Sequence, residues 1–186
     1  MRTLRKRCSW SAQHPLLAEY HDKEWGRPKH DDRVHFEFLV LEAAQAGLSW
    51  LTVLKKREGY RRHFAQFDCK KVAKFGEAQV KRMMKDPGII RNQLKIRSAI
   101  SNARCFLKVQ KEFGSFDQYL WNFVKNKPIL NRVCSKKDLL PSSPLSDAVS
   151  KDLKKRGFRF VGTTIIYSHL QAVGVINDHE IKCFCR

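Results

Sequence analysis

Apolar side chains recur at helical spacing along most of this 186-residue chain, and no run of useful length alternates apolar and polar residues as a strand would. Short breaks rich in Gly, Pro and Asp separate the helical runs. The pattern predicts helices over residues 36–46, 50–60, 70–85, 89–113, 116–124, 146–156 and 163–173, with a surface loop over 130–144. The expected fold class is all-α, in one domain over residues 1–186 whose two helical lobes enclose a cleft.

The first helical run carries a carboxylate, Glu42, among apolar residues. One face of this run is apolar at helical spacing: Phe36, Leu39, Val40 and Ala43. Gly47 stands where a left-handed residue ends a helix, and Trp50 follows shortly after it. Because a buried acid is costly unless it is paired or used, an acid beside an aromatic residue in a basic protein favours a pocket for a nucleobase. The alternative is that Glu42 lies on the solvated edge of the helix or pairs with a Lys or Arg.

The charge balance predicts a polyanionic partner. Lys and Arg outnumber Asp and Glu by 37 to 18, which gives a net charge of +19. An anionic membrane surface is the rival partner, but the basic residues are spread along the whole chain, and no lipidation signal or long apolar span is present. Residues 1–7 are basic without a following apolar segment, so a secretory signal is not expected. We therefore expect a cytoplasmic monomer that binds nucleic acid and no membrane.

Cysteine and histidine residues at the two ends of the chain predict a metal site. Cys8 and His21 stand near the N-terminus, and His179 and Cys183 stand four residues apart near the C-terminus. Two thiolates and two imidazoles suit tetrahedral zinc, and four protein ligands leave no open position, so the expected role is structural. Such a site would fasten the two chain ends together. The alternatives are that these residues are unconnected, or that Cys185 replaces Cys183.

A short segment bracketed by glycines predicts a hairpin between two helices at residues 157–162. Gly157 ends one helical run, and Gly162 precedes the next, where the backbone N–H groups of Gly162, Thr163 and Thr164 open a helix that can hold a phosphate. Basic residues flank the hairpin: Lys154, Lys155, Arg156 and Arg159. They favour DNA phosphate binding over the alternative, a plain packing corner.

The chain resembles the bacterial 3-methyladenine DNA glycosylase I family nearly from end to end. The blocks that carry the resemblance are Cys8-Ser9-Trp10, Tyr20-His21-Asp22-Lys23-Glu24-Trp25-Gly26, Gln45-Ala46-Gly47-Leu48-Ser49-Trp50, Gly88-Ile89-Ile90-Arg91, Leu153-Lys154-Lys155-Arg156-Gly157-Phe158, Phe160-Val161-Gly162-Thr163-Thr164, and Asn177-Asp178-His179 with Cys183. The resemblance implies a helix-hairpin-helix glycosylase fold with its hairpin at 157–162. It also implies a zinc ion on the four residues already singled out for metal binding.

The resemblance further implies the residues that handle the substrate. Glu42, Tyr20 and Trp50 would form the pocket for the excised base, with Glu42 as the catalytic group, and Leu48 would wedge into the gap left by the flipped nucleotide. The implied substrate is double-stranded DNA that contains alkylated bases. The implied reaction is hydrolysis of the N-glycosidic bond of 3-methyladenine, the first step of base excision repair.

Two points of mechanism separate this hypothesis from its alternatives. The segment 157–162 contains no lysine able to form a Schiff base, so we expect attack by water and no strand nicking, against the alternative of a lyase-coupled enzyme. Asp178 lies where relatives in the wider superfamily carry a catalytic aspartate, but as the neighbour of His179 it is expected to play a structural role. The competing class is a zinc-stabilised DNA-binding protein without activity, which would have no use for Glu42.

Overall fold

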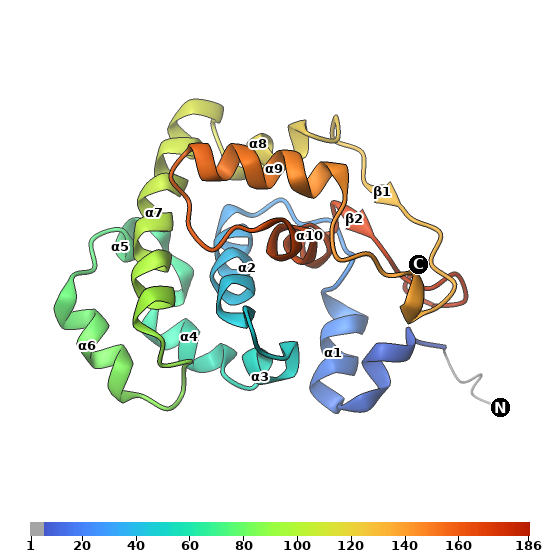
Figure 1. Cartoon of the computed structure of the whole chain (residues 1–186), viewed down its shortest axis with the longest axis horizontal. Helices are drawn as coiled ribbons and strands as arrows, with labels where there is room; N and C mark the ends of the chain where they lie inside the picture. Colours follow the sequence, from blue (N-terminus) through green and yellow to red (C-terminus); the bar gives the residue numbers. More distant parts are fainter. Residues whose placement is uncertain (1–5) are drawn as a thin grey trace.

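The computed structural model describes residues 6–186, so residues 1–5 of the basic N-terminal segment lie outside the described residues. The chain is mostly helical, as predicted (Figure 1). Its α-helices are α1 (Pro15–Lys23), α2 (Asp32–Gln45), α3 (Trp50–Leu54), α4 (Arg57–His63), α5 (Cys69–Val72), α6 (Glu77–Lys85), α7 (Gln93–Phe113), α8 (Phe116–Asn122), α9 (Pro144–Lys155) and α10 (Thr163–Ala172). Shorter 3-10 turns are η1 (Ser9–Gln13), η2 (Ala65–Phe67) and η3 (Lys136–Asp138). Two-residue strands β1 (Ile129–Leu130) and β2 (Ile176–Asn177) pair in parallel, with Ile129 opposite Ile176.

Helix α2 lies at the centre of the fold. Every residue from 35 to 44 is buried, and α2 packs against α3, α7, α8 and α10. Asp31 caps its first turn by accepting a hydrogen bond from the backbone N–H of Arg33 at 2.7 Å. A helix that is covered on all sides has to be apolar all round, which explains the near-continuous hydrophobic sequence of this segment. The buried polar residues His35, Glu37 and Glu42 are the departures from that pattern on α2.

Helices α9 and α10 pack against each other, and α10 also packs against α2. The segment 156–162 joins them, and Gly157 adopts a left-handed conformation with a φ of +91° directly after α9. The side chain of Asn102, on α7, holds the turn by donating to the carbonyl of Arg159 at 2.9 Å and accepting from the N–H of Arg159 at 2.8 Å. The predicted turn between two helices is therefore present, and it is fixed by a side chain from a third helix.

Several predicted helices are shorter than their apolar patterns. The run 50–60 is divided into α3 and α4, the run 70–85 is divided into α5 and α6, and α7 begins at Gln93 rather than at residue 89. The loop that precedes α7 explains the last difference, because Asn92 caps that helix. The same loop passes so close to α4 that a Cβ at Gly59 would lie 2.1 Å from the carbonyl oxygen of Gly88. Tertiary contacts therefore override the local periodicity here.

The segment predicted as a surface loop, 130–144, is attached to the C-terminal part of the chain. It begins in β1, continues through a parallel bridge between Val133 and Glu180, forms η3, and enters α9 at Pro144. The N–H of Ile181 donates to the carbonyl of Val133 at 2.8 Å. The prediction of an exposed connection is therefore correct in part, but its first half is hydrogen-bonded to the chain terminus.

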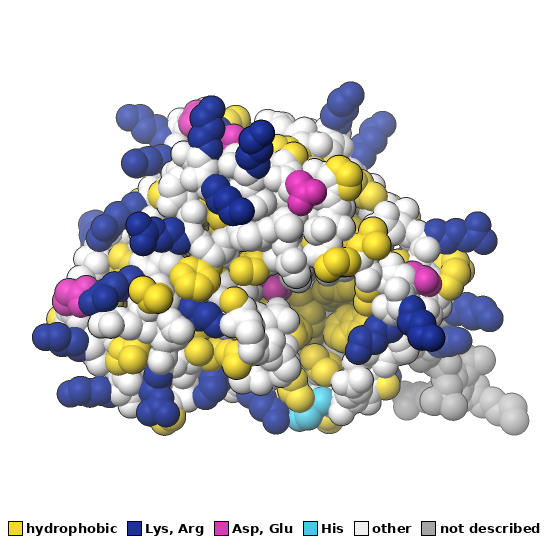
Figure 2. All heavy atoms as spheres, viewed as in Figure 1, with side chains coloured by type: hydrophobic (Ala, Val, Ile, Leu, Met, Phe, Trp, Pro, Cys, Tyr) yellow, Lys and Arg dark blue, Asp and Glu magenta, His cyan; other side chains and the backbone are white. Residues whose placement is uncertain are grey.

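Basic side chains cover much of the surface. Figure 2 shows Lys and Arg around the periphery of one face, with a hollow whose inner surface is largely hydrophobic. Within residues 6–186, no helix combines the length and the apolar character needed to cross a lipid bilayer.

A buried histidine pair joins α2 to α10. His35 is fully buried and His169 is 1% exposed, and their ring centroids lie 6.0 Å apart. His35 Nε2 lies 3.1 Å from Asp117 Oδ1, whereas neither ring nitrogen of His169 has a hydrogen-bond partner among the described residues. Burial, and to a lesser degree the nearby His35, hold the pKa of His169 well below its ordinary value. His169 is therefore neutral in the folded protein.

The substitution His169→Phe should make folding less sensitive to acid. Below about pH 6.5, His169 is protonated in the unfolded chain but not in the folded chain. As the pH decreases, the unfolding free energy of the wild type should therefore fall by about 1.4 kcal/mol per pH unit relative to that of the variant. Urea unfolding at pH 7.5, 6.5 and 5.5 measures this. Parallel pH dependences of the two proteins would contradict the prediction.

Candidate functional site

A cleft of about 330 Å³ lies between α1, α2, α3 and α10. Aromatic and polar side chains line it, together with part of the segment that follows β1: Trp10, Tyr20, Trp25, Glu42, Gln45, Trp50, Lys136, Leu139, Leu140, Pro141, Thr164, Tyr167, Ser168 and Gln171. The cleft thus brings together Glu42, Tyr20 and Trp50, the three residues that the sequence predicts as a base pocket. A hollow of this size with a mostly aromatic and apolar wall and one acid is typical of a small-molecule or base-binding site.

Glu42 is the acidic group of the cleft. It lies near the end of α2 with 4% of its surface exposed, which contradicts the alternative of a solvated helix edge. Burial raises the pKa of Glu42 to about 8, and no cation among the described residues offsets this shift. The contrast with Glu37 on the same helix is sharp, since Glu37 accepts a 2.7 Å hydrogen bond from Arg57. Glu42 is therefore a buried carboxyl group that the protein leaves without a counter-ion.

Aromatic rings surround this carboxyl group. Tyr20, on α1, and Trp50, the first residue of α3, have ring centroids 5.2 Å apart at an interplanar angle of 55°. Phe38 stacks beneath Trp50 with a centroid distance of 6.4 Å. Burial raises the pKa of Tyr20 well above its ordinary value, and the charge of Glu42 contributes to the shift. The indole N–H of Trp50 is buried without a partner among the described residues, so it is a donor available to a ligand.

Leu48 borders a second, smaller hollow of about 160 Å³, which adjoins the cleft through shared residues such as Glu42 and Thr164. Leu48 is 42% exposed and follows Gly47, whose φ of +78° turns the chain after α2, as predicted. Lys95 fixes this corner by donating hydrogen bonds to the carbonyls of residues 44 and 46 at 3.0 and 2.6 Å. An exposed apolar side chain is thus held at the edge of the site by a rigid turn.

The start of α10 reaches the same region. Thr164 lines both hollows, while Gly162 is the N-cap of α10 and offers no capping side chain. The hydroxyl of Thr163 is engaged with Asp147 and lies 2.8 Å from Ser146 Oγ. Gly157 lies at the other end of the turn and lines neither hollow. Of the four predicted DNA-binding residues of the hairpin, only Thr164 therefore belongs to the cleft wall.

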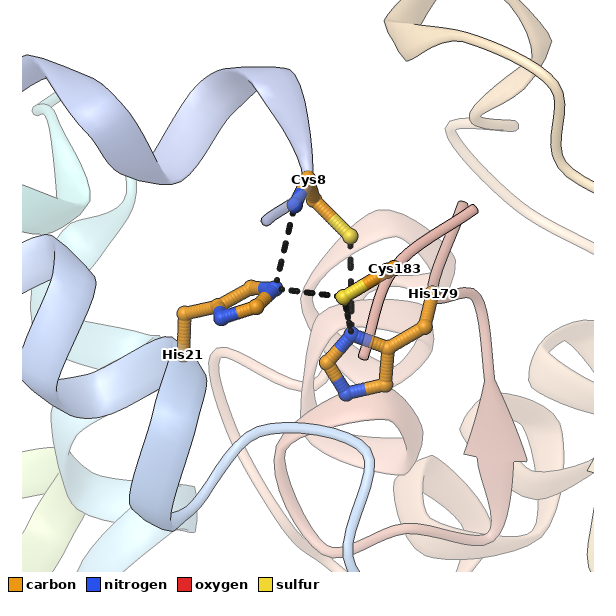
Figure 3. A group of neighbouring side chains, drawn as sticks. All are labelled: Cys8, His21, His179 and Cys183. Carbon is orange, nitrogen blue, oxygen red and sulfur yellow. Dashed lines mark hydrogen bonds between the residues drawn. The ribbon is translucent and has the colours of Figure 1, made fainter. Parts of the chain in front are cut away.

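The predicted metal ligands form one cluster. Cys8, His21, His179 and Cys183 are all buried, their ligand atoms lie within 4.8 Å of one another, and their side chains point to a common centre (Figure 3). Cys183 Sγ lies 3.3 Å from His21 Nε2 and 3.5 Å from His179 Nδ1, and Cys8 Sγ lies 3.4 Å from His179 Nδ1. These separations are close to the distance of about 3.6 Å between a sulfur ligand and a nitrogen ligand of a tetrahedral zinc ion. The cluster could hold a metal ion.

The surroundings of the cluster fit this role. His21 Nδ1 lies 2.8 Å from Asp22 Oδ1, and His179 Nε2 lies 3.0 Å from the carbonyl oxygen of Trp25, so each ring directs its other nitrogen toward the centre. Burial lowers the pKa of His179 to about 4 and raises the pKa of Cys8 to about 12. Neutral imidazoles are ready ligands, and a divalent cation would compensate the charge of two thiolates. Cys185, the predicted rival of Cys183, lies outside this cluster.

Asp178 is buried and fully hydrogen-bonded. Its carboxylate accepts from Asn131 at 2.7 Å, from the hydroxyl of Tyr167 at 2.8 Å and from the amide of Gln171 at 2.6 Å. Because Tyr167 and Gln171 line the cleft, Asp178 holds two wall residues from behind. These contacts favour the structural role over a catalytic one, since its acceptor sites are already occupied.

Several cleft residues were not predicted from the sequence. On α10, the polar residues at i+3, i+4 and i+7 from the predicted Thr164 form a stripe with it that a helical-wheel reading could have found: Tyr167, Ser168 and Gln171. Trp10 stands two residues after a metal ligand, which is a weaker signal. Nothing in the sequence indicated that residues 136–141 reach the cleft.

Comparison with known proteins identifies the family. A sequence model described as methyladenine glycosylase matches residues 10–186. DNA-3-methyladenine glycosylase 1 of Escherichia coli (strain K12) is 49% identical over 180 residues, which cover 97% of this chain and 96% of that protein. The DNA-3-methyladenine glycosylase of Haemophilus influenzae (strain ATCC 51907 / DSM 11121 / KW20 / Rd) is 43% identical, with 97% of each chain covered.

Solved structures agree with this similarity. A crystal structure of 3-methyladenine DNA glycosylase I superposes with a TM-score of 0.94 at 50% identity, covering 97% of this chain and 100% of that chain. A structure that describes 3-methyladenine recognition by the Staphylococcus aureus enzyme superposes with a TM-score of 0.93 at 35% identity, covering 96% and 95%.

Glu42→Gln should stabilise the folded protein at alkaline pH. Between about pH 4.5 and pH 8, Glu42 is ionised in the unfolded chain and protonated in the folded chain. The unfolding free energy of the wild type should therefore fall by about 1.4 kcal/mol per pH unit relative to that of the variant as the pH rises. Urea unfolding at pH 5, 6.5 and 8 measures the growing gap. Glu58→Gln, on the exposed face of α4, is the control, and its unfolding free energy should change with pH as that of the wild type does. A pH-independent difference in unfolding free energy between Glu42→Gln and the wild type would show that the carboxyl group is not desolvated.

Proposed function

The chain belongs to the methyladenine glycosylase family, and we propose that the cleft between α1, α2, α3 and α10 receives the base that this enzyme removes. The reaction is hydrolysis of the N-glycosidic bond of 3-methyladenine in alkylated DNA, which leaves an abasic site for base excision repair. The observation that carries the assignment of the cleft is Glu42, a buried carboxyl group without a counter-ion, in an aromatic pocket of a protein with net charge +19.

The cleft suits a cationic base. Methylation at N3 places positive charge on adenine, and an electron-poor ring stacks favourably on Trp50 and Tyr20, with a cation–π contribution of roughly 0.5–2 kcal/mol. Glu42 accepts hydrogen bonds from the adenine edge, and the cation that enters supplies the counter-charge that the protein withholds. Normal adenine carries no such charge, so it gains neither interaction and is released.

The chemistry needs little more than selection and orientation. A positively charged base is already a good leaving group, because it takes up the electron pair of the N-glycosidic bond and departs as neutral 3-methyladenine. The positive charge passes to the sugar as this bond breaks, and the negative charge of Glu42 stabilises it there, which is the sense in which the residue is catalytic. Water attacks the sugar carbon, because residues 157–162 offer no lysine for a Schiff base. The enzyme is therefore monofunctional and leaves the strand intact.

Access to the base requires that the nucleotide leave the duplex, which costs a few kcal/mol and less for a damaged pair. Leu48, exposed on its rigid turn, fills the gap in the stack. Segment 157–162 with its flanking helices acts as a helix-hairpin-helix element, in which the uncapped N–H groups at Gly162, Thr163 and Thr164 hold a backbone phosphate. The left-handed Gly157 shapes the turn and does not contact the base.

The Cys8, His21, His179 and Cys183 cluster holds a structural zinc ion. Two sulfur and two nitrogen donors at tetrahedral separations favour zinc, and four protein ligands leave no position at which water could be activated. The ion therefore joins the chain ends and takes no part in hydrolysis.

The remaining assignments follow from the substrate. The whole chain acts as one domain, with two helical lobes on either side of the cleft, and one molecule suffices to hold one extruded base. The enzyme works as a monomer on double-stranded DNA in the cytoplasm.

Glu42→Ala should slow base release without loss of DNA binding. We expect wild-type protein to release 3-methyladenine from methylated DNA, and Glu42→Ala to release it roughly 10²-fold more slowly, because the group that favours the cationic base is gone. Chromatography of released bases measures the rate, and binding to undamaged duplex checks that the variant is folded. Undiminished release by Glu42→Ala would place base recognition elsewhere.

Removal of one cluster ligand should release the metal. Cys183→Ser should lower the zinc content from one equivalent per chain to well below half and lower the melting temperature, whereas Cys185→Ser, two residues away and outside the cluster, should retain both. Atomic emission on purified protein and thermal unfolding measure the two effects. Equal zinc content in both variants would contradict the assignment.

A further inference from the structure

A segment beside the cleft has no role in the function described so far. We call residues 136–141 the strap; it comprises η3 and the three residues after it. Four of its six residues line the cleft: Lys136, Leu139, Leu140 and Pro141. The strap thus forms part of the wall of the cavity that contains Glu42.

The strap is anchored on both sides. Before it, Val133 is bridged to Glu180 and accepts from the N–H of Ile181 at 2.8 Å. After it, Ser143 caps α9 by accepting from the N–H of Ser146. Within η3, the carboxylate of Asp138 accepts from the backbone N–H groups of residues 134 and 135 at 2.9 Å each. These contacts fix the strap against the cleft.

The strap presents a cation without a partner. Lys136 is exposed, and no acidic side chain in residues 6–186 forms an ion pair with it within 4.0 Å. The nearest acid along the chain, Asp138, is committed to backbone N–H groups, and Glu42 is the acidic residue among those that line the cleft. The ammonium group of Lys136 is therefore free to meet an anion that approaches the cleft.

Apolar side chains follow the cation directly. Leu140 is 57% exposed, although it lines the cleft, and Leu139 and Pro141 lie on either side of it in the same wall. A single exposed leucine needs no explanation, but three adjacent apolar residues at the rim of a functional cleft indicate a surface that a ligand covers. Along the strap, the cation Lys136 is followed by an apolar surface. This arrangement matches a nucleotide, in which an anionic phosphate adjoins a largely apolar face of the deoxyribose.

Extrusion of a base brings its backbone to the rim of the pocket. When the base lies against Glu42 and Trp50, the sugar and the adjoining phosphates follow it, because they are covalently joined to it. A protein that holds an extruded nucleotide needs a cation and an apolar contact at the rim in addition to the base pocket. On this chain, the strap supplies both within six residues.

We propose that the strap binds the backbone of the extruded nucleotide, with Lys136 on a phosphate that adjoins the damaged nucleoside and Leu140 against its deoxyribose. This inference rests on the proposed function, since it takes the base to occupy the cleft. It adds a nucleotide-binding element distinct from Leu48 and from the start of α10. Because the contact forms only when the nucleotide is extruded, the strap favours damaged over undamaged DNA.

Adjacent lysines provide a matched test. Lys136 lines the cleft, whereas Lys137 is equally exposed, carries the same charge and does not line it. Fluorescence anisotropy should compare Lys136→Gln, Lys137→Gln and Leu140→Ser with wild type. The probes are a duplex with a central tetrahydrofuran abasic analogue and the same duplex undamaged. All three side chains are exposed, so the variants should fold like wild type, which thermal unfolding verifies.

We expect Lys136→Gln to weaken binding to the abasic duplex by about five- to tenfold, and binding to the undamaged duplex by no more than Lys137→Gln does. Leu140→Ser should weaken only the abasic complex, by about threefold. The KM for release of 3-methyladenine should rise in Lys136→Gln and stay near the wild-type value in Lys137→Gln.

Two results would overturn the proposal while the proposed function stands. If the two lysine variants lost equal affinity for both duplexes, Lys136 would act only through the overall positive charge of the surface. If Lys136→Gln bound both duplexes as wild type does, Lys136 would have no part in DNA binding. Failure of wild-type protein to release any 3-methyladenine is a different result. It would overturn the proposed function, and the strap proposal with it.

Discussion

The unpaired carboxyl group of Glu42, in the buried part of helix α2, is the constraint on which the arrangement of the cleft depends. Another acid on that helix, Glu37, shows how the fold accommodates an acid with a structural role. Arg57 bridges it to Glu24, with hydrogen bonds of 2.6 to 2.8 Å. Glu42 receives no such partner, although the protein carries 37 basic residues. A group that is costly to desolvate and is left uncompensated in so basic a protein is reserved for a cation from outside.

Affinity for DNA and selectivity for a damaged base depend on different parts of the protein. The positive surface attracts any nucleic acid and cannot distinguish a damaged base from a normal one. In the proposed function the cleft distinguishes them, because it is aromatic, partly desolvated and carries an acid whose pKa of about 8 falls when a cation binds beside it. The lack of a cation beside Glu42 among the described residues is therefore as important to the enzyme as the cations on its surface.

The sequence predicted the parts of this structure that depend on local pattern. Helical spacing identified the buried helix α2 and the turn at Gly47, and the residue types at the chain ends identified the Cys/His cluster that could hold a metal ion. It did not predict the division of residues 50–60 into α3 and α4, since the loop at Gly88 that packs on Gly59 is distant in sequence. The strap was missed for the same reason, because its position depends on pairing between β1 and the C-terminal segment.

The cluster of Cys8, His21, His179 and Cys183 connects these distant parts to the cleft. His21 directly follows Tyr20 on α1, and Cys8 stands two residues before Trp10, so both N-terminal ligands lie beside cleft residues. On the C-terminal side, Asp178 precedes His179 and holds two residues of α10, while the pairing of β2 with β1 leads to the strap. The cluster, which lies outside the cleft, thus fixes three of its walls at once. Its loss would loosen both the geometry around Glu42 and the core, because Cys8 and Cys183 themselves belong to the hydrophobic core that surrounds α2.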